Sequence, residues 1–422
     1  MNKFKPISIS LSPNVEKDDV RLALNLIIRP WLWVNGKGVK ELEESFRNYL
    51  GVKYAFSFNS GRSALYAVLK SLCLEKNDKA FLQAFTCNAS INPFLWAELK
   101  PIYVDCNGDD FNIDVESLKK KISENPNAKV LMIQHTFGMP ANMDEINSLV
   151  KQHGLILIED CAHSLGARYN NQFVGKFGKV AFFSFSRDKI ISSVYGGMAI
   201  TNDENIAEKL RDAQLEFKTP SVFWVFQQLL HPILLYYVIL PVYNFFDLGK
   251  IFLIFSQILH VLSKAVSKEE KNGLKPDYFP KAMPNALAVL AVNQLAKVEK
   301  FNNHRQKVAN FYFKNLDEKK FDLPKQFPGR KSAFLRFTVK YLNVHEIIYR
   351  SWHRQNMLLG DWYTTPIAPF DTDLSQMHYK KGTCPVAEYL AEKTFNLPTH
   401  INIRKSDAKR IVDFLNNFKK EK

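Results

Sequence analysis

Short runs of hydrophobic residues alternate with helix-like segments along the first two hundred residues of the chain. The runs are rich in Val, Ile, Leu and Phe without strict polar alternation, which is typical of strands buried on both faces. They occupy 53–58, 79–85, 101–105, 129–137, 155–160 and 179–185. Segments with helical character, such as 63–72 and 142–154, lie between them. This order predicts an α/β fold with a mostly parallel sheet flanked by helices, whose ligands bind at the carboxyl ends of the strands.

The second half of the chain follows a different pattern. An amphipathic helix is predicted over 285–312, and the last hundred residues mix strands and helices, ending in a helix over 405–418. We therefore predict a smaller C-terminal α/β domain. The predicted division is a large domain over 1–218, an apolar helical insertion over 219–270, a return to the large domain over 271–300 and the small domain over 301–422.

The insertion is unusually apolar. Residues 219–246 contain no Asp, Glu, Lys or Arg, and 251–263 are also uncharged. The first run is long enough to span a bilayer, which takes about 20 apolar residues, but Pro232 and Pro241 disfavour one straight helix. Because both flanks belong to one predicted domain, we expect a helical hairpin over 222–263 that dips into one leaflet of a membrane. An oligomer interface or a buried helical pair is the alternative. In the membrane-dipping arrangement, anionic lipid headgroups would bind the flanking lysines, which are residues 218, 250, 264, 268 and 271.

Composition narrows the class of partner. The chain has 422 residues and a net charge of +15, which favours an anionic ligand such as a phosphorylated substrate or an acidic lipid surface. No basic stripe with interleaved aromatic residues is present, so nucleic acid is not expected. The five cysteines show neither a CxxC pair nor a Cys/His metal spacing, which indicates a reducing compartment and predicts no metal site. The N-terminus lacks the apolar core of a secretory signal, so we expect a cytoplasmic protein, peripheral or monotopic at the inner face of the membrane.

Four residues that could carry chemistry follow predicted strands in order. Gly61 lies in a strand-to-helix turn, Asp160 ends a strand, and Ser184 and Lys189 close and follow the run 179–185. Taken singly, the turn at Gly61 would only cap a helix, Asp160 would be an ion-paired acid, and Lys189 would be a surface lysine. Together they supply what pyridoxal phosphate (PLP) requires: amides and a hydroxyl for its phosphate, a carboxylate for its ring nitrogen and an amine for its aldehyde.

Sequence motifs extend this interpretation. The stretches WLWVNGKGVKELEESF, NSGRSAL, IEDCAHSLGA, FSFSRDK, GGMAITN and FNLPTH occur in this order. From about residue 30 to 202 and again from about 284 to the end, the chain resembles the DegT/DnrJ/EryC1/StrS family of PLP-dependent sugar aminotransferases. The resemblance implies the PLP-dependent transferase fold of type I, which is the aspartate aminotransferase-like fold, and a homodimer. It also implies transfer of an amino group from an amino acid, glutamate above all, to a keto sugar on a nucleotide or lipid carrier in surface polysaccharide or amino-sugar biosynthesis.

The resemblance also implies individual roles. Lys189 would bond to the cofactor aldehyde and then carry protons as a general base and acid. Asp160 would keep the ring nitrogen protonated, and His163 stands where the family has Gln or His near the ring's 3-oxygen. Related dehydratases carry His at the lysine position, so the presence of Lys189 favours transamination.

The resemblance places the cofactor phosphate on Ser184 and on the backbone at Gly61 and Arg62. The family usually has Thr at position 62, so Arg62 either adds a cationic phosphate contact or points into solvent.

Other departures concern the surroundings of the cofactor. Cys87 takes the place of the aromatic residue that commonly stacks on the ring, for which Phe85 is a substitute only under a shifted alignment. Tyr195 replaces an acid, and Pro280 replaces the Asn that reaches a partner subunit's phosphate. These departures leave a second hypothesis open, that the protein is a catalytically altered PLP-binding scaffold or regulator at the membrane.

Overall fold

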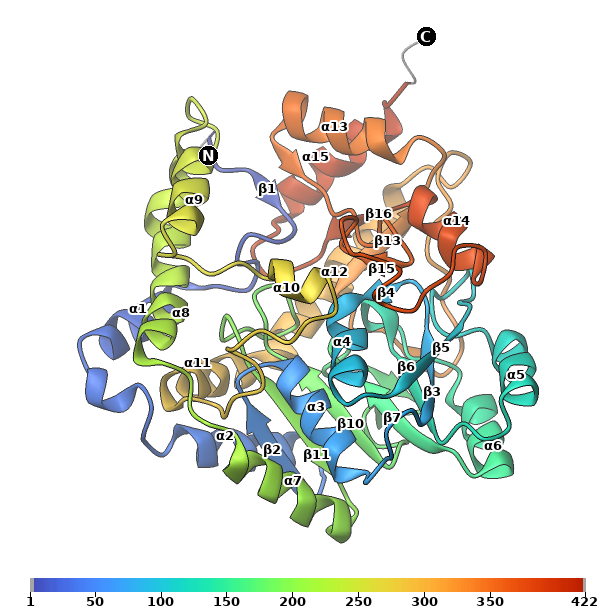
Figure 1. Cartoon of the computed structure of the whole chain (residues 1–422). Helices are drawn as coiled ribbons and strands as arrows, with labels where there is room; N and C mark the ends of the chain where they lie inside the picture. Colours follow the sequence, from blue (N-terminus) through green and yellow to red (C-terminus); the bar gives the residue numbers. More distant parts are fainter. Residues whose placement is uncertain (1–3, 420–422) are drawn as a thin grey trace.

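The computed structural model describes residues 4–419, and a seven-stranded sheet lies at its centre (Figure 1). All six predicted strands are present in this sheet. A seventh strand, β11, was not predicted, and it is antiparallel to both of its neighbours, while the other pairings are parallel. The order across the sheet is β2 (Tyr54–Phe58), β11 (Gly197–Thr201), β10 (Val180–Ser184), β7 (Ile156–Asp160), β6 (Val130–Gln134), β3 (Lys79–Gln83) and β5 (Lys100–Val104).

Helices cover both faces of the sheet, as predicted. Successive strand residues point to opposite faces, so Phe182 of β10 packs in one core cluster and Phe183 in another. One face packs against α3 (Gly61–Ser71), α4 (Asn88–Trp96) and α7 (Glu204–Glu216). The other face packs against α2 (Gly38–Leu50), α5 (Val115–Glu124), α6 (Met143–His153) and α11 (Asn285–Leu295).

The predicted helix over 285–312 is wrong in one respect, because two helices replace it. α11 ends at Leu295, and α12 (Val298–Asn315) begins after Lys297, which has a non-helical backbone with φ −102° and ψ 1°. Nearly all of α11 is buried, whereas α12 keeps one buried stripe. The break lets α12 leave the large sheet and pack against α15 (Lys405–Asn416).

The C-terminal part of the chain builds its own hydrophobic cluster. The cluster consists of buried side chains between residues 308 and 418, together with Ile7. It surrounds the antiparallel strands β13 (Arg336–Lys340) and β16 (Thr394–Pro398), with α13 (Val344–Gln355) alongside and α14 (Pro385–Lys393) leading into β16. Short pairings join it to the rest: β1 (Ile7–Ser8) with β14 (Met357–Leu358), and β4 (Thr86–Cys87) with β15 (Ile367–Ala368). The three-stranded sheet β12-β8-β9 unites Arg330–Lys331, Arg168–Tyr169 and Gln172–Phe173.

The apolar insertion forms two helices at one side of the molecule, and the first of them packs against α1 (Lys17–Ile27) (Figure 1). α8 (Val222–Leu234) continues through a π-helical turn (Leu235–Ile239) and a short 3-10 turn (Leu240–Val242). Pro232 lies inside α8 and cannot donate a backbone hydrogen bond, and the π-helical turn begins three residues after it. α9 (Leu248–Ile258) then packs back against the π-helical turn. The segment 222–242 is long and apolar enough to cross a membrane, but 50% of the apolar 18-residue stretch within it is buried in the protein, and the core helix of a soluble protein can have the same length and composition.

Candidate active site

A cavity of about 390 Å³ opens at the carboxyl ends of β2, β6, β7 and β10. Its volume lies in the range of small-molecule sites. All six residues predicted for the site line this cavity, namely Gly61, Arg62, Asp160, His163, Ser184 and Lys189. They come from loops up to 128 positions apart, from residue 61 to residue 189, and the parallel strand order brings them together.

Asp160 presents a buried carboxylate to the cavity. It is the last residue of β7, and its two oxygens accept hydrogen bonds from Ser90 Oγ and from the backbone N–H of Ala162, both at 2.9 Å. No cation within residues 4–419 forms an ion pair with it. Burial raises the pKa of Asp160 above its ordinary value, although both donors and Lys189 oppose this shift. A cationic ring nitrogen is the kind of partner that this carboxylate lacks.

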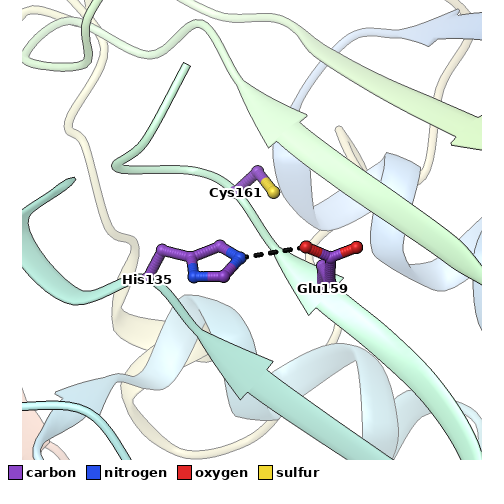
Figure 2. A group of neighbouring side chains, drawn as sticks. All are labelled: His135, Glu159 and Cys161. Atoms are coloured by element: carbon purple, nitrogen blue, oxygen red, sulfur yellow. Dashed lines mark hydrogen bonds and ion pairs between the residues drawn. The ribbon is translucent and has the colours of Figure 1, made fainter. Parts of the chain in front are cut away.

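The residue before it, Glu159, points to the opposite side of the strand and is fully engaged. It accepts backbone hydrogen bonds from Gly175, Phe177 and Gly178 at 2.6–2.7 Å. It also lies 3.0 Å from Nε2 of His135, with Cys161 nearby (Figure 2). Nδ1 of His135 accepts from the N–H of Ala141, so Nε2 carries the proton that Glu159 accepts. These three side chains lie close enough to surround a metal ion, but the Glu159 oxygens already accept hydrogen bonds from the loop over 175–178 and from His135.

Lys189 brings a buried amine to the same cavity. It follows the turn after β10, and its backbone carbonyl accepts a hydrogen bond from the side chain of Asn14. Its Nζ lies 4.8 Å from the centre of the Trp362 ring, and no carboxylate in the described chain pairs with it. Burial lowers the pKa of Lys189 below its ordinary value of 10.5. The amine therefore loses its proton more readily than an exposed lysine.

The neutral imidazole ring of His163 lines one side of the cavity. Its Nδ1 accepts a hydrogen bond of 3.3 Å from the N–H of Phe137, and its ring stacks on Trp362 at 5.4 Å between centroids. Burial lowers the pKa of His163 well below 6.5, and the charge of Lys189 lowers it further. A neutral imidazole that accepts at Nδ1 carries its proton on Nε2, which is then available as a donor.

Gly61 and Ser184 meet at one end of the cavity. A Cβ on Gly61 would lie 2.9 Å from the Cβ of Ser184, so only glycine allows the start of α3 to approach β10 this closely. Ser60 caps α3 by accepting from the N–H of Ser63. The amides of the first helical turn therefore face the end of the cavity marked by Ser184, where an anion is favoured.

Arg62 does not point into solvent. Its Nη1 lies 2.6 Å from Oε1 of Glu270, which is fully buried in the short helix α10 (Lys268–Lys271). Its Nη2 donates to the carbonyl of Ala265, and its guanidinium lies 4.8 Å from the ring centre of Phe279. Glu270 therefore already matches the charge of Arg62.

Several further residues line or border the cavity and were missed in the sequence. Trp362, Tyr363 and Arg187 line it, whereas Arg336 lies over the Trp362 ring at 3.3 Å. Trp362 and Tyr363 were missed because 361–370 lies far along the chain, in a loop without a recognisable motif. Arg187 lies within the motif FSFSRDK, but there the family roles fell on Ser184 and Lys189. Phe85, the suggested substitute for the stacking aromatic residue, is fully buried in a cluster with Phe111 and Phe137 and does not line the cavity.

The insertion also contributes to the site. His231 and Leu235 from the first insertion helix, and Leu253 and Gln257 from α9, form part of the cavity wall. The apolar segment is therefore joined to the chemistry rather than attached elsewhere on the surface.

These residues fit pyridoxal phosphate: a buried unpaired carboxylate, a buried amine, a neutral imidazole and a helix N-terminus face one cavity. The fold agrees with this assignment. The structure superposes on PseC of Helicobacter pylori, an aminotransferase involved in the biosynthesis of pseudoaminic acid, with a TM-score of 0.73 at 20% identity, covering 97% of both chains. It superposes on GDP-4-keto-6-deoxy-D-mannose-3-dehydratase of Escherichia coli with a TM-score of 0.74 at 20% identity, covering 97% of this chain and all of that one. Fold and site define a PLP-dependent transferase of fold type I.

The family follows from the sequence comparison. The sequence pattern of the DegT/DnrJ/EryC1/StrS aminotransferase family matches residues 14–222 and 261–416, and the chain belongs to that family. It is a PLP-dependent aminotransferase. GDP-perosamine synthase of Vibrio cholerae is 24% identical over an alignment 423 positions long, which covers 96% of this chain and 97% of that protein. The family match omits 223–260, which is nearly the whole of α8 and α9.

Proposed function

We propose that this enzyme moves an amino group from glutamate to a keto sugar carried on a nucleotide or a lipid, with Lys189 as its catalytic residue. The observation that carries the proposal is that Lys189 and Asp160 line the same cavity. The sugar acceptor is supported by the similarity over nearly the full chain to GDP-perosamine synthase, an enzyme named for an amino sugar.

Bound pyridoxal phosphate supplies an aldehyde that reacts with amines and a ring that withdraws electrons from the attached carbon. Lys189 takes the proton from the α-carbon of the amino acid in the first half-reaction. In the second half-reaction it delivers a proton to the sugar carbon that receives nitrogen. Its lowered pKa leaves more of the amine neutral, as a general base requires.

Three groups hold the cofactor in this proposal. Asp160 pairs with the ring nitrogen and keeps it protonated. Nε2–H of His163 donates to the 3-oxygen, a role that its neutral tautomer permits. The hydroxyl of Ser184 and the amides at Gly61 and Arg62 bind the phosphate.

Replacement of the lysine tests the proposal. Lys189→Ala should abolish the absorbance band of covalently held PLP and lower turnover with glutamate and a panel of keto sugars by at least about 1,000-fold. Lys40→Ala, an exposed position on α2, is the matched control and should behave as wild type. An unchanged absorbance band in Lys189→Ala would remove the assignment. Wild-type protein that binds PLP but fails to exchange the α-proton of glutamate would favour the scaffold or regulator hypothesis instead.

We further propose that the insertion 222–263 rests on the inner face of the cytoplasmic membrane. Hydrophobic side chains on α9 and directly after it are strongly exposed, with Ile254 at 55%, Ile258 at 62% and the following Leu259 at 68%. α8 packs against α1 and α11, so α9 would lie in the membrane plane rather than cross it. Lys250 and Lys271 form ion pairs with Asp247 and Asp371, so hydrophobic contact outweighs charge in this proposal.

Vesicle flotation tests the membrane proposal. Wild-type protein should float with vesicles of phosphatidylcholine, and modestly better when phosphatidylglycerol is added. The double variant Ile254→Asp/Ile258→Asp should stay in the dense fraction, whereas Leu215→Asp, at an even more exposed apolar residue on α7, should float. If the wild-type protein does not float and the double variant has a different oligomer mass in solution, the exposed face of α9 is an oligomer interface.

A homodimer is the third proposal and rests on the family resemblance. Light scattering during gel filtration should give about twice the chain mass of 48.7 kDa. A monomeric mass for the fully active enzyme would contradict it.

A further inference from the structure

A second arginine lies at the same end of the cavity as Gly61. Arg187 follows Ser184 by three positions, in the turn after β10, and lines the cavity. Its Nη2 donates to Ser263 Oγ at 2.6 Å, and its guanidinium lies 5.4 Å from the ring centre of Tyr195. Its Nε is buried and has no hydrogen-bond partner among the residues that the structure describes.

The charge of Arg187 is not matched by a carboxylate within residues 4–419. The adjacent acid, Asp188, pairs with Arg336 at 3.1 Å, and Glu270 pairs with Arg62 at 2.6 Å. Burial lowers the pKa of Arg187, an effect that Tyr195 and Asp188 oppose and to which the charge of Arg62 adds. A partly buried guanidinium without an ion-pair partner is destabilising, and functional sites are where such groups are retained.

Contacts to three consecutive residues place Arg187 at the phosphate end of the cavity. Arg187 donates to Ser263, the hydroxyl of Tyr195 donates to the carbonyl of Lys264, and Arg62 donates to the carbonyl of Ala265. Arg62 belongs to the first turn of α3, so the free amides of that helix lie at the same end. The N-terminus of α3 and an unmatched guanidinium thus lie at one end of one cavity, which is the chemistry that binds a phosphate dianion.

We infer that Arg187, rather than Arg62, is the cation that binds a phosphate dianion in this site. The inference rests on the proposed cofactor site, and the phosphate belongs either to the cofactor or to the carrier of the sugar. In both cases Arg187 counters a charge that Arg62 cannot, because Arg62 is already neutralised by Glu270.

The test compares two forms of the cofactor on the full-length apoprotein. Pyridoxal has the aldehyde and the ring but no phosphate. Arg187→Gln should weaken binding of pyridoxal phosphate by about 10- to 100-fold, the usual effect of losing a charge-assisted hydrogen bond, and should change pyridoxal binding less than about 2-fold. Arg187→Lys should retain part of the preference. Arg211→Gln, at an exposed residue of α7, is the matched control and should leave both affinities unchanged.

A second arm detects a phosphate outside the cofactor. Inorganic phosphate is added to the PLP-loaded protein, and its effect on the thermal midpoint is compared between wild type and Arg187→Gln. A change in the first arm assigns Arg187 to the cofactor phosphate. Stabilisation by phosphate that occurs in wild type and is lost in Arg187→Gln, without a change in the first arm, assigns it to the carrier. No difference in either arm overturns the inference, whereas absence of a covalent band in wild type with either aldehyde would instead overturn the proposed cofactor site.

Discussion

The residue Arg62 illustrates how a single departure from a family pattern acquires its meaning only from its neighbours. In the sequence, an arginine in place of threonine suggested either a phosphate contact or a solvent-exposed charge. In the structure its side chain is 11% exposed and joined to the fully buried Glu270. Its replacement is therefore expected to affect stability first.

Removal of Arg62 should leave a buried carboxylate unpaired. We expect Arg62→Gln to lower the free energy of unfolding by about 3–5 kcal/mol. The double variant Arg62→Gln/Glu270→Gln should recover most of this loss, because it buries no charge. Urea unfolding of both single variants and of the double variant measures the coupling. Additive losses in the double variant would show that the pair does not act as a unit.

Asp160 and Glu159 show the reverse case, in which adjacent residues of one type have different tasks. Because side chains alternate along β7, one carboxylate faces the cavity and the other binds the loop over 175–178. Asp160→Asn should lower turnover by at least about 100-fold while leaving the thermal midpoint nearly unchanged, since the amide oxygen can still accept from the N–H of Ala162 and the amide N–H can donate to the Ser90 hydroxyl. Glu159→Gln should instead lower the thermal midpoint. Parallel assays of turnover and thermal unfolding would separate the two, and equal effects of both changes would contradict these roles.

At the level of elements, the pairing of α9 with the π-helical turn depends on Gly249. A Cβ there would lie 2.3 Å from the carbonyl oxygen of Ile239 and 2.5 Å from Cα of Tyr243, and neither backbone atom can yield easily. The helical hairpin predicted from the apolar pattern therefore requires glycine at the contact. No periodicity rule reveals this requirement.

Gly249→Ala tests that contact. In an isolated helix alanine is favoured over glycine by about 1 kcal/mol, but here the overpacked contact should dominate and destabilise the protein by about 1–3 kcal/mol. Gly108→Ala is the control, because its added Cβ would lie 4.0 Å from Val386. Guanidinium unfolding of the two variants measures the difference. A stabilised Gly249→Ala variant would mean that the two helices are not packed this closely.

At the level of the whole molecule, His400 joins the two ends of the chain. Its Nε2 donates to the carbonyl of Ser8 at 2.8 Å, and its Nδ1 accepts from the N–H of Asn402. Burial, with a smaller effect from Arg305, lowers the pKa of His400 from 6.5 to about 3. The unfolded chain therefore takes up a proton near pH 6.5 that the folded protein does not accept until about pH 3.

This difference predicts a stability that falls on the acid side. The contribution of His400 is complete above pH 6.5 and is lost as the pH falls toward 3, by at most about 1.4 kcal/mol per pH unit. His163 and His231 also have pKa values lowered by desolvation and act in the same direction. His400→Gln should reduce the slope of unfolding free energy against pH between 6 and 4. Urea unfolding over a pH series provides the measurement, and an unchanged slope would contradict the assignment.

Local chemistry was enough to predict a large part of this protein. Continuous apolar runs identified six strands, because a strand buried on both faces has no polar alternation, and residues directly after those runs identified Asp160, Ser184 and Lys189 as a group. The strand β11 was missed because its residues resemble a glycine-rich loop, and it becomes a strand only by pairing with β10 and β2.

The sequence by itself therefore determined six of the seven strands of the sheet, the site residues at the ends of those strands, and the family. What only the tertiary structure decided is every property that depends on a distant neighbour: the neutralisation of Arg62 by Glu270, the unmatched charge of Arg187, and the approach of Trp362 to Lys189. Strand and helix patterns arise from residues a few positions apart. Charge compensation and burial depend on groups that are brought together only when the chain is packed.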